Sequence, residues 1–167
     1  MEYQSNLSRR EFLSGLALTG LAAIATSSCG KSYDPRLNDR KQLQVITPDM
    51  NQKVLGSEGV VLVEFTLPNC HYNDVVNPLY AKVSQDYDPR DIWFTRSDIN
   101  GNPDLAKVLD VGVGPRIAIV KAGKPLYVVT GSDFMAGGVE YNKPAPQDKQ
   151  ESAFRKTLEQ NMKKHIK

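Results

Sequence analysis

The chain has 167 residues, of which 40% are hydrophobic and 24% charged, a composition typical of a packed globular domain rather than of a disordered polypeptide. Its 21 basic and 19 acidic residues give a net charge of +2, which argues against nucleic acid as an obligatory partner. The two cysteines, Cys29 and Cys70, are too few for a disulfide framework, and too few for a closed structural zinc site unless chains combine.

Residues 1–28 are predicted to be an export signal. Arg9 and Arg10 precede a mildly apolar stretch, 12–25, that is shorter than the roughly 20 apolar residues of a membrane-spanning helix. The order Ser-Arg-Arg-Glu-Phe-Leu at 8–13 resembles the twin-arginine signal, which implies export to a bacterial periplasm. The alternative is a chance arginine pair in front of a buried helix.

Two cleavage sites are compatible with this signal. The sequence TSSCG at 26–30 resembles a lipoprotein cleavage box that makes Cys29 the lipidated first residue, although Thr26 stands where that family prefers an aliphatic residue. Cleavage after Ala25 is the alternative, and it would leave Cys29 as a thiol. A lipid on Cys29 would hold the protein to a membrane through a polar tether, 29–42, since each buried methylene contributes ~0.8 kcal/mol.

A folded domain is predicted over 43–167, beginning with a strand at 43–47 and a helix at 48–55 that has proline in its first turn. The run VVLVEFT at 60–66 is β-branched and apolar almost throughout, which predicts a central strand buried on both faces. Apolar residues at helical spacing predict a helix over 73–87, kinked at Pro78.

The second half of the domain continues the alternation of strands and helices. The sequence predicts a strand at 91–98, a helix at 103–109, a hairpin of strands at 117–120 and 126–129, a Gly- and Pro-rich loop at 133–146, and an amphipathic helix at 147–164. The resulting order, β-α-β-α-β-α-β-β-α, implies an α/β domain with a mixed central sheet and helices on both faces.

This order and several local motifs resemble the thioredoxin fold over about 43–164. Residues 61–65 resemble the central strand of that family, Cys70 follows the acidic Glu64 at the spacing of the family's nucleophilic cysteine, and Pro78 matches its helix-kinking proline. Further matches are the D-x-x-x-N-P passage at 98–103, the segment 111–115 that ends in the family's cis-proline, and the hairpin at 121–124.

The active-site motif departs from the family pattern in four places. The CxxC motif reads CHYN at 70–73, so Asn73 replaces the resolving cysteine, and Asn69 replaces the tryptophan before the motif. Gly114 precedes the proline Pro115 in place of a β-branched residue, and Arg116 follows it in place of threonine.

The resemblance places Cys70 at the start of a helix, where backbone N–H groups and the helix dipole favour a thiolate. His71 could add a positive charge or a hydrogen bond, and Asn73 could donate its amide hydrogens to the sulfur. Without a resolving thiol the intramolecular cycle cannot close, so a CxxC-type disulfide reductase or oxidase is not expected from this chain alone. Cys29 could resolve Cys70 only if it carries no lipid.

Four interpretations of Cys70 remain open. It could be a monothiol site that forms mixed disulfides with a protein or peptide partner, or part of a redox-inactive binding or assembly module that accompanies an exported redox enzyme. A metal site with Cys70 and His71 as adjacent ligands would need further donors from a partner, and we predict no resident metal or cofactor. A peroxidatic thiol is the fourth, but Leu67 stands where peroxiredoxins have threonine.

The remaining site predictions concern partner binding and proton transfer. The proline loop of this fold presents backbone groups to an extended segment beside the cysteine, which predicts a partner-binding face made of His71, Tyr72, Asn73, Gly114, Pro115 and Arg116. Arg116 would favour an acidic partner segment, unless it is simply solvated. Glu64 is either a proton relay for the thiol or a buried acid without a chemical role.

Overall fold

The computed structural model describes residues 43–112, 114, 116–142 and 147–166. The predicted export signal with Arg9 and Arg10, the tether with Cys29, and Pro115 all lie outside the described residues. The predictions made for them are therefore not tested by the structure.

A five-stranded mixed sheet forms the centre of the domain, in the order β1-β3-β2-β4-β5. Its strands are β1 (Gln44–Val45), β2 (Val60–Thr66), β3 (Ile92–Asp98), β4 (Arg116–Lys121) and β5 (Lys124–Val129). Strands β1, β3 and β2 are parallel, whereas β4 runs antiparallel to both β2 and β5. The long apolar strand predicted from the sequence is β2, the middle strand of this sheet.

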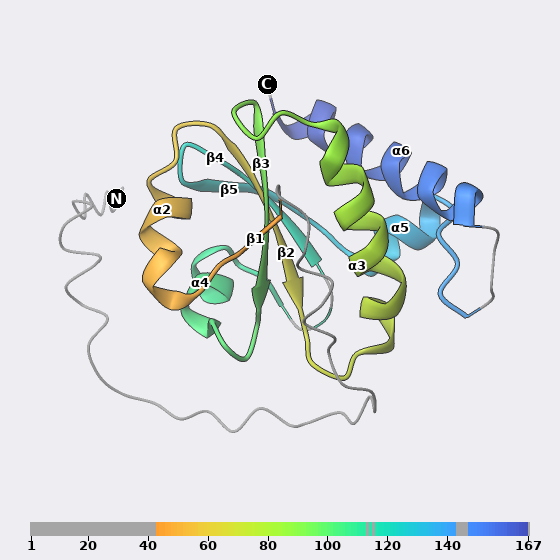
Figure 1. Ribbon diagram of the computed structural model, residues 1–167, viewed down its shortest axis with the longest axis horizontal. Helices are drawn as coiled ribbons and strands as arrows, with labels where there is room; N and C mark the ends of the chain where they lie inside the picture. Colours follow the sequence, from red (N-terminus) through yellow and green to blue (C-terminus); the bar gives the residue numbers. More distant parts are fainter. Residues whose placement is uncertain (1–42, 113, 115, 143–146, 167) are drawn as a thin grey trace, which may run out of the picture.

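Helices cover both faces of the sheet (Figure 1). On one face lie α2 (Asn51–Leu55), which continues from the short helix η2 (Pro48–Met50), and α4 (Pro103–Val108). On the other face lie α3 (His71–Val83), which runs on into η3 (Ser84–Asp86), α5 (Gly131–Ala136) and α6 (Gln147–His165). The layered α/β arrangement predicted from the order of elements is thus present.

The side chains of β2 explain why this strand is apolar almost throughout. Successive side chains of a strand point to opposite faces, so Val61, Val63 and Phe65 pack under α2 and α4, while Leu62 packs under α3 and α6. All four are fully buried. Glu64 shares the face of Leu62 and is also fully buried, which places a carboxyl group inside the domain.

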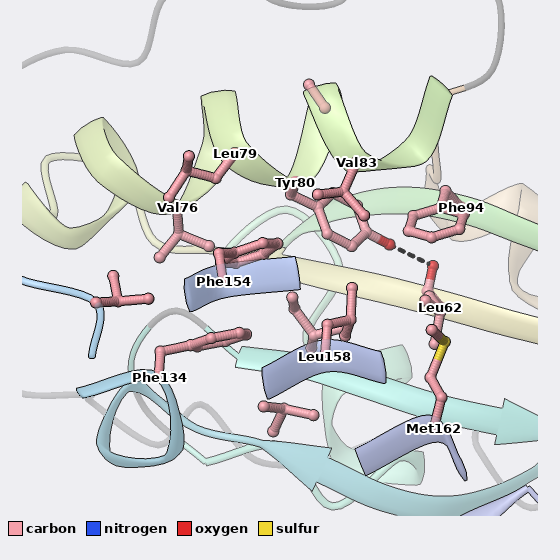
Figure 2. Close-up of a cluster of buried hydrophobic side chains, with 14 of the residues drawn as sticks. Leu62, Val76, Leu79, Tyr80, Val83, Phe94, Phe134, Phe154, Leu158 and Met162 are labelled. Carbon is pink, nitrogen blue, oxygen red and sulfur yellow. Dashed lines mark hydrogen bonds between the residues drawn. The ribbon is translucent and has the colours of Figure 1, made fainter. Parts of the chain in front are cut away.

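The core between the sheet and helices α3, α5 and α6 combines aliphatic and aromatic side chains (Figure 2). The hydroxyl of Tyr80, in α3, donates to the carbonyl oxygens of Leu62, at 2.9 Å, and Thr95, at 3.2 Å. These contacts fix α3 to the adjacent strands β2 and β3. Phe134 of α5 and Phe154 of α6 stack with ring centroids 4.5 Å apart. Helix α5 is therefore part of the core and not a surface turn.

The prediction of a loop over 133–146 is wrong for its beginning, because Gly131–Ala136 is helical. A capping box starts this helix: Thr130 Oγ1 accepts from the Asp133 N–H at 3.4 Å, and Asp133 Oδ2 accepts from the Thr130 N–H at 2.7 Å. The glycines that follow, Gly137 and Gly138, suggested a loop but instead mark the end of the helix. Helix α3 also begins earlier than predicted, at His71.

Candidate functional site

Cys70 lies at the junction of β2 and α3, after a tight turn. Asn69 adopts a left-handed conformation with φ of 62°, and the Cys70 N–H donates to the Leu67 carbonyl at 3.2 Å. Cys70 itself is the extended N-cap residue of α3, and it is partly exposed. The first-turn N–H groups of a helix lack intrahelical acceptors, so this position favours a negative charge on the sulfur.

Asn73, at the position of the resolving cysteine, holds this turn closed. Its Nδ2 donates to the Leu67 carbonyl at 2.6 Å, the same oxygen that accepts from the Cys70 N–H. The sequence allowed this amide to donate to the Cys70 sulfur, and the structure shows it donating to the backbone of the turn. Asn73 is buried, and its Oδ1 has no hydrogen-bond partner among the described residues. The observed hydrogen bond of Asn73 therefore stabilises the turn that presents Cys70.

His71 and Tyr72 contact a segment that follows α5, far along the chain. His71 Nε2 lies 3.0 Å from the carbonyl oxygen of Tyr141, and its Nδ1 lies 3.6 Å from Asp74 Oδ2. The ring of Tyr72 meets that of Tyr141 edge to face, with centroids 4.5 Å apart. Sequence reasoning missed Tyr141, since no local pattern indicates which surface a segment 70 residues away will cover.

Glu64 forms a buried ion pair with Arg96, its cross-strand partner on β3. Arg96 Nε donates to Glu64 Oε2 at 2.6 Å, and Arg96 Nη2 donates to the Asn77 carbonyl of α3 at 3.1 Å. Burial raises the pKa of Glu64 to about 7, and the charge and hydrogen bond of Arg96 oppose that shift. Sequence reasoning also missed Arg96, although an arginine inside the strand IWFTRSD was a visible signal of a buried partner.

The residues of the predicted proline loop are only partly described. Gly114 has φ of +106°, a left-handed conformation that favours glycine, and Pro115 lies outside the described residues. Arg116 begins β4, and its guanidinium lies over Gly112, where an added Cβ would come within 3.3 Å of Nη2. Arg116 shares a strand face with Ala118, which packs in the α2 and α4 core, so its side chain is on the face opposite α3.

The other site predictions concern metals and membranes. Among the described residues, no three His, Cys, Asp or Glu side chains gather in a group that could hold a metal ion. The imidazole of His71 contacts a backbone carbonyl through one nitrogen and lies near Asp74 through the other. Within the same described part of the chain, no helix is long and apolar enough to cross a membrane.

The sequence is similar to known proteins that belong to one family. The sequence profile of the family described as Thioredoxin matches residues 41–136. The chain is 33% identical over 132 residues to the chloroplastic thioredoxin F-type of Pisum sativum, covering 76% of this chain and 70% of that protein. It is 30% identical over 99 residues to protein disulfide-isomerase A4 of Homo sapiens, covering 58% of this chain and 15% of that longer protein.

Two further similarities agree with the family profile. Thioredoxin 1 of the cyanobacterium Nostoc is 29% identical over 89 residues, which cover 53% of this chain and 82% of that protein. The solved structure of thioredoxin from Malassezia sympodialis superposes with a TM-score of 0.56 at 20% identity, covering 75% of this chain and 92% of that one, and thus shares the fold. Because the family profile covers the sheet, the cysteine turn and α3, the chain belongs to the thioredoxin family and has the thioredoxin fold.

Proposed function

We propose that this protein captures partner proteins or peptides through a single thiol, Cys70. The observation that carries the proposal is the position of Cys70 as the N-cap residue of α3, partly exposed, with Asn73 where the family has its second cysteine. Helix N-termini stabilise a thiolate, which is the nucleophile in disulfide exchange. Membership of the thioredoxin family supports thiol-related chemistry at this position.

The proposed reaction is one step of thiol–disulfide exchange. The Cys70 thiolate attacks one sulfur of a partner disulfide, a new Cys70–partner disulfide forms, and the second partner sulfur leaves as a thiolate that takes up a proton. The captured partner is released when an external thiol attacks the mixed disulfide. Glu64 is the proposed proton relay of this step; it is buried in the ion pair with Arg96, and burial raises its pKa to about 7.

The test is a trapping experiment with the full-length chain and its Cys70→Ser variant, expressed with an affinity tag in a bacterial host. We expect envelope proteins linked to the peptide that contains Cys70, detected by non-reducing mass spectrometry and released by dithiothreitol. The Cys29→Ser variant is the matched control, since it removes the other thiol and should leave these adducts intact. Absence of any adduct on Cys70 would contradict the proposal.

The same experiment examines the alternative function. A redox-inactive binding or assembly module, accompanying an exported redox enzyme, would retain the same partner in the Cys70→Ser variant without a reducible bond. The replacement of the resolving cysteine by Asn73, whose amide fixes the turn backbone, is the observation that favours this alternative. Partner retention that is independent of Cys70 would therefore replace covalent capture as the function.

We further propose that the protein works in the bacterial envelope, anchored by a lipid on Cys29. The proposal is supported by the twin-arginine pattern around Arg9 and Arg10 and by the small residues before Cys29. Fusing residues 1–35 to a reporter should give export that is lost in the Arg9→Lys, Arg10→Lys double variant. The Cys29→Ser variant should move from the membrane fraction to the soluble fraction; unchanged membrane association would argue against the lipid.

A further inference from the structure

The segment 139–141 lies against the first turn of α3 although it follows α5 in the chain. Its backbone is held on the α5 side by a hydrogen bond from the Val139 N–H to the Phe134 carbonyl at 2.9 Å. On the α6 side, Gln150 makes two hydrogen bonds with the backbone of Glu140, accepting from its N–H at 3.0 Å and donating to its carbonyl at 2.6 Å. Two helices of the core therefore fix the position of this segment.

The fixed segment presents one residue, Tyr141, to the two residues that follow Cys70. The carbonyl of Tyr141 contacts the His71 imidazole, and its ring packs edge to face on the ring of Tyr72. Tyr141 is only 6% exposed, whereas Tyr72 is 37% exposed. The buried ring thus supports an exposed one at the surface beside Cys70.

The contact with the carbonyl determines which nitrogen of His71 carries the proton. A carbonyl oxygen only accepts hydrogen bonds, so the interaction at 3.0 Å requires a hydrogen on Nε2. In the neutral imidazole, Nδ1 is then the acceptor nitrogen, and it faces the side of Asp74. His71 is therefore tied to Tyr141 by a donated hydrogen bond, although 59% of its side chain is exposed.

Segment 139–141 lies outside the part of the chain that matches the thioredoxin profile, which ends at residue 136. The contact between Tyr141 and the first turn of α3 is thus made from outside the matched part of the chain.

We propose that Tyr141 is a positioning residue for the Cys70 site, which it affects by fixing His71 and Tyr72. The inference rests on the proposed function of Cys70, because it concerns how that thiol is presented. The first-turn N–H groups stabilise a thiolate only when the turn keeps its helical geometry. By holding the side chains of two residues in this turn, Tyr141 keeps the start of α3 in the helical geometry that places its positive dipole end at Cys70.

The test is the rate of Cys70 alkylation by iodoacetamide from pH 5 to pH 10, in the Cys29→Ser background where Cys70 is the remaining thiol. In the Tyr141→Ala and Gln150→Leu variants we expect the rate at pH 7 to fall about two- to fivefold, the size of a helix N-terminal effect. The rate at the alkaline plateau should stay the same, because a loosened turn changes the thiolate fraction and not the accessibility of the sulfur.

Two control variants and a further test variant accompany this measurement. Tyr141→Phe keeps the ring and should keep the native pH profile, and so should Leu126→Ala, at an exposed position of the edge strand β5. His71→Ala removes the exposed partner of the Tyr141 carbonyl without creating a core cavity, and we expect it to shift the profile in the same direction as Tyr141→Ala. It keeps the test valid if Tyr141→Ala does not fold.

A second readout does not involve Cys70. Nitrogen NMR of the neutral His71 ring should show the proton on Nε2 in the native protein and a mixture of tautomers in the Gln150→Leu variant. A proton on Nδ1 in the native protein, or native alkylation profiles in the Tyr141→Ala and His71→Ala variants, would overturn the inference. A different combination of results would reject only the proposed capture function. In that case the trapping experiment fails, while the proton lies on Nε2 and the alkylation profiles of the variants are shifted.

Discussion

At the scale of single residues, Glu64 is a fully buried titratable group whose pKa lies near neutral pH. Only one of its oxygens, Oε2, bonds to Arg96, while Oε1 has no hydrogen-bond partner among the described residues. A half-satisfied carboxylate that is fully buried is destabilised more by the loss of water than it is stabilised by one cation, and its pKa rises to about 7. The folded state therefore binds a proton that the unfolded chain releases near pH 4.5.

This difference predicts how stability depends on pH. A raised folded-state pKa contributes stability that is present in full below the unfolded value of 4.5 and is lost as pH rises through about 7. Between pH 5 and pH 8, native protein should lose about 2 kcal/mol of unfolding free energy relative to the Glu64→Gln variant, which cannot titrate there. Urea unfolding at several pH values measures this loss. In the control variant Glu58→Gln, at an exposed site, the unfolding free energy should change with pH as it does in the native protein. If the unfolding free energy of Glu64→Gln also changes with pH as in the native protein, the raised pKa of Glu64 is contradicted.

Replacing Arg96 tests the same ion pair with Glu64 from its other side. Replacing it by methionine leaves the Glu64 carboxyl buried without a counter-charge and removes the hydrogen bond to the Asn77 carbonyl. Arg96→Met should lower the free energy of unfolding by about 3 kcal/mol at pH 8, and by less at pH 5, where Glu64 becomes neutral. Arg90→Met, which removes an exposed ion pair with Asp88, is the matched control and should change nothing measurable. An equal loss at both pH values would mean that Glu64 does not take up the proton.

At the scale of elements, α5 and α6 approach each other closely at Gly137. A Cβ on Gly137 would lie 3.1 Å from Thr157 Cβ and still closer to Thr157 Oγ1, so the position has no room for a side chain. Gly137→Ala should destabilise the protein by about 2 kcal/mol through overpacking, measured by thermal or urea unfolding. Gly59→Ala is the matched control, because its nearest neighbour would be Ser57 Oγ at 3.8 Å. Equal stability of the two variants would show that the helices separate without cost.

The sequence predicted the elements whose signals are local. The apolar run at 60–66 identified the central strand, because that signal depends on neighbours in the chain, whereas the helix predicted from residue 73 begins two residues earlier, at His71. Helix α5 was missed since six residues contain too few apolar positions for a helical period, although the Thr130 and Asp133 capping box was visible in the sequence.

The contacts that sequence reasoning missed depend on tertiary structure. Arg96 meets Glu64 across 32 positions only because β2 and β3 pair in one register, in which these two residues are partners. Tyr141 meets His71 across 70 positions because the chain returns to the start of α3 after α5, where Gln150 of α6 holds the backbone of Glu140. Neither register nor return path is encoded in a short window, so the sequence indicated Cys70 and its neighbours in the chain but not the contacts of Arg96 and Tyr141.

At the scale of the whole molecule, the two cores share one sheet. Phe154 of α6 is fully buried on one face and Leu105 of α4 on the other, and the strands between them, β2 and β4, contribute side chains to both cores. A cavity on either face should therefore weaken the same cooperative unit, because neither core persists without the strands that it shares with the other. The domain should behave as one unfolding unit even though α6 lies beyond the part that matches the family profile.

Two truncations on opposite faces test this unity. Phe154→Ala and Leu105→Ala should each cost about 3 kcal/mol of unfolding free energy, since each removes a large side chain that the surrounding core cannot fully replace. Both should unfold in a single urea transition with the native slope, seen identically by circular dichroism and by tyrosine fluorescence. Leu126→Ala, at an exposed position of the edge strand β5, should change stability by less than about 0.5 kcal/mol. A second transition in Phe154→Ala alone would mean that α6 detaches from the sheet before the rest unfolds, and that Tyr141 leaves the Cys70 turn with it.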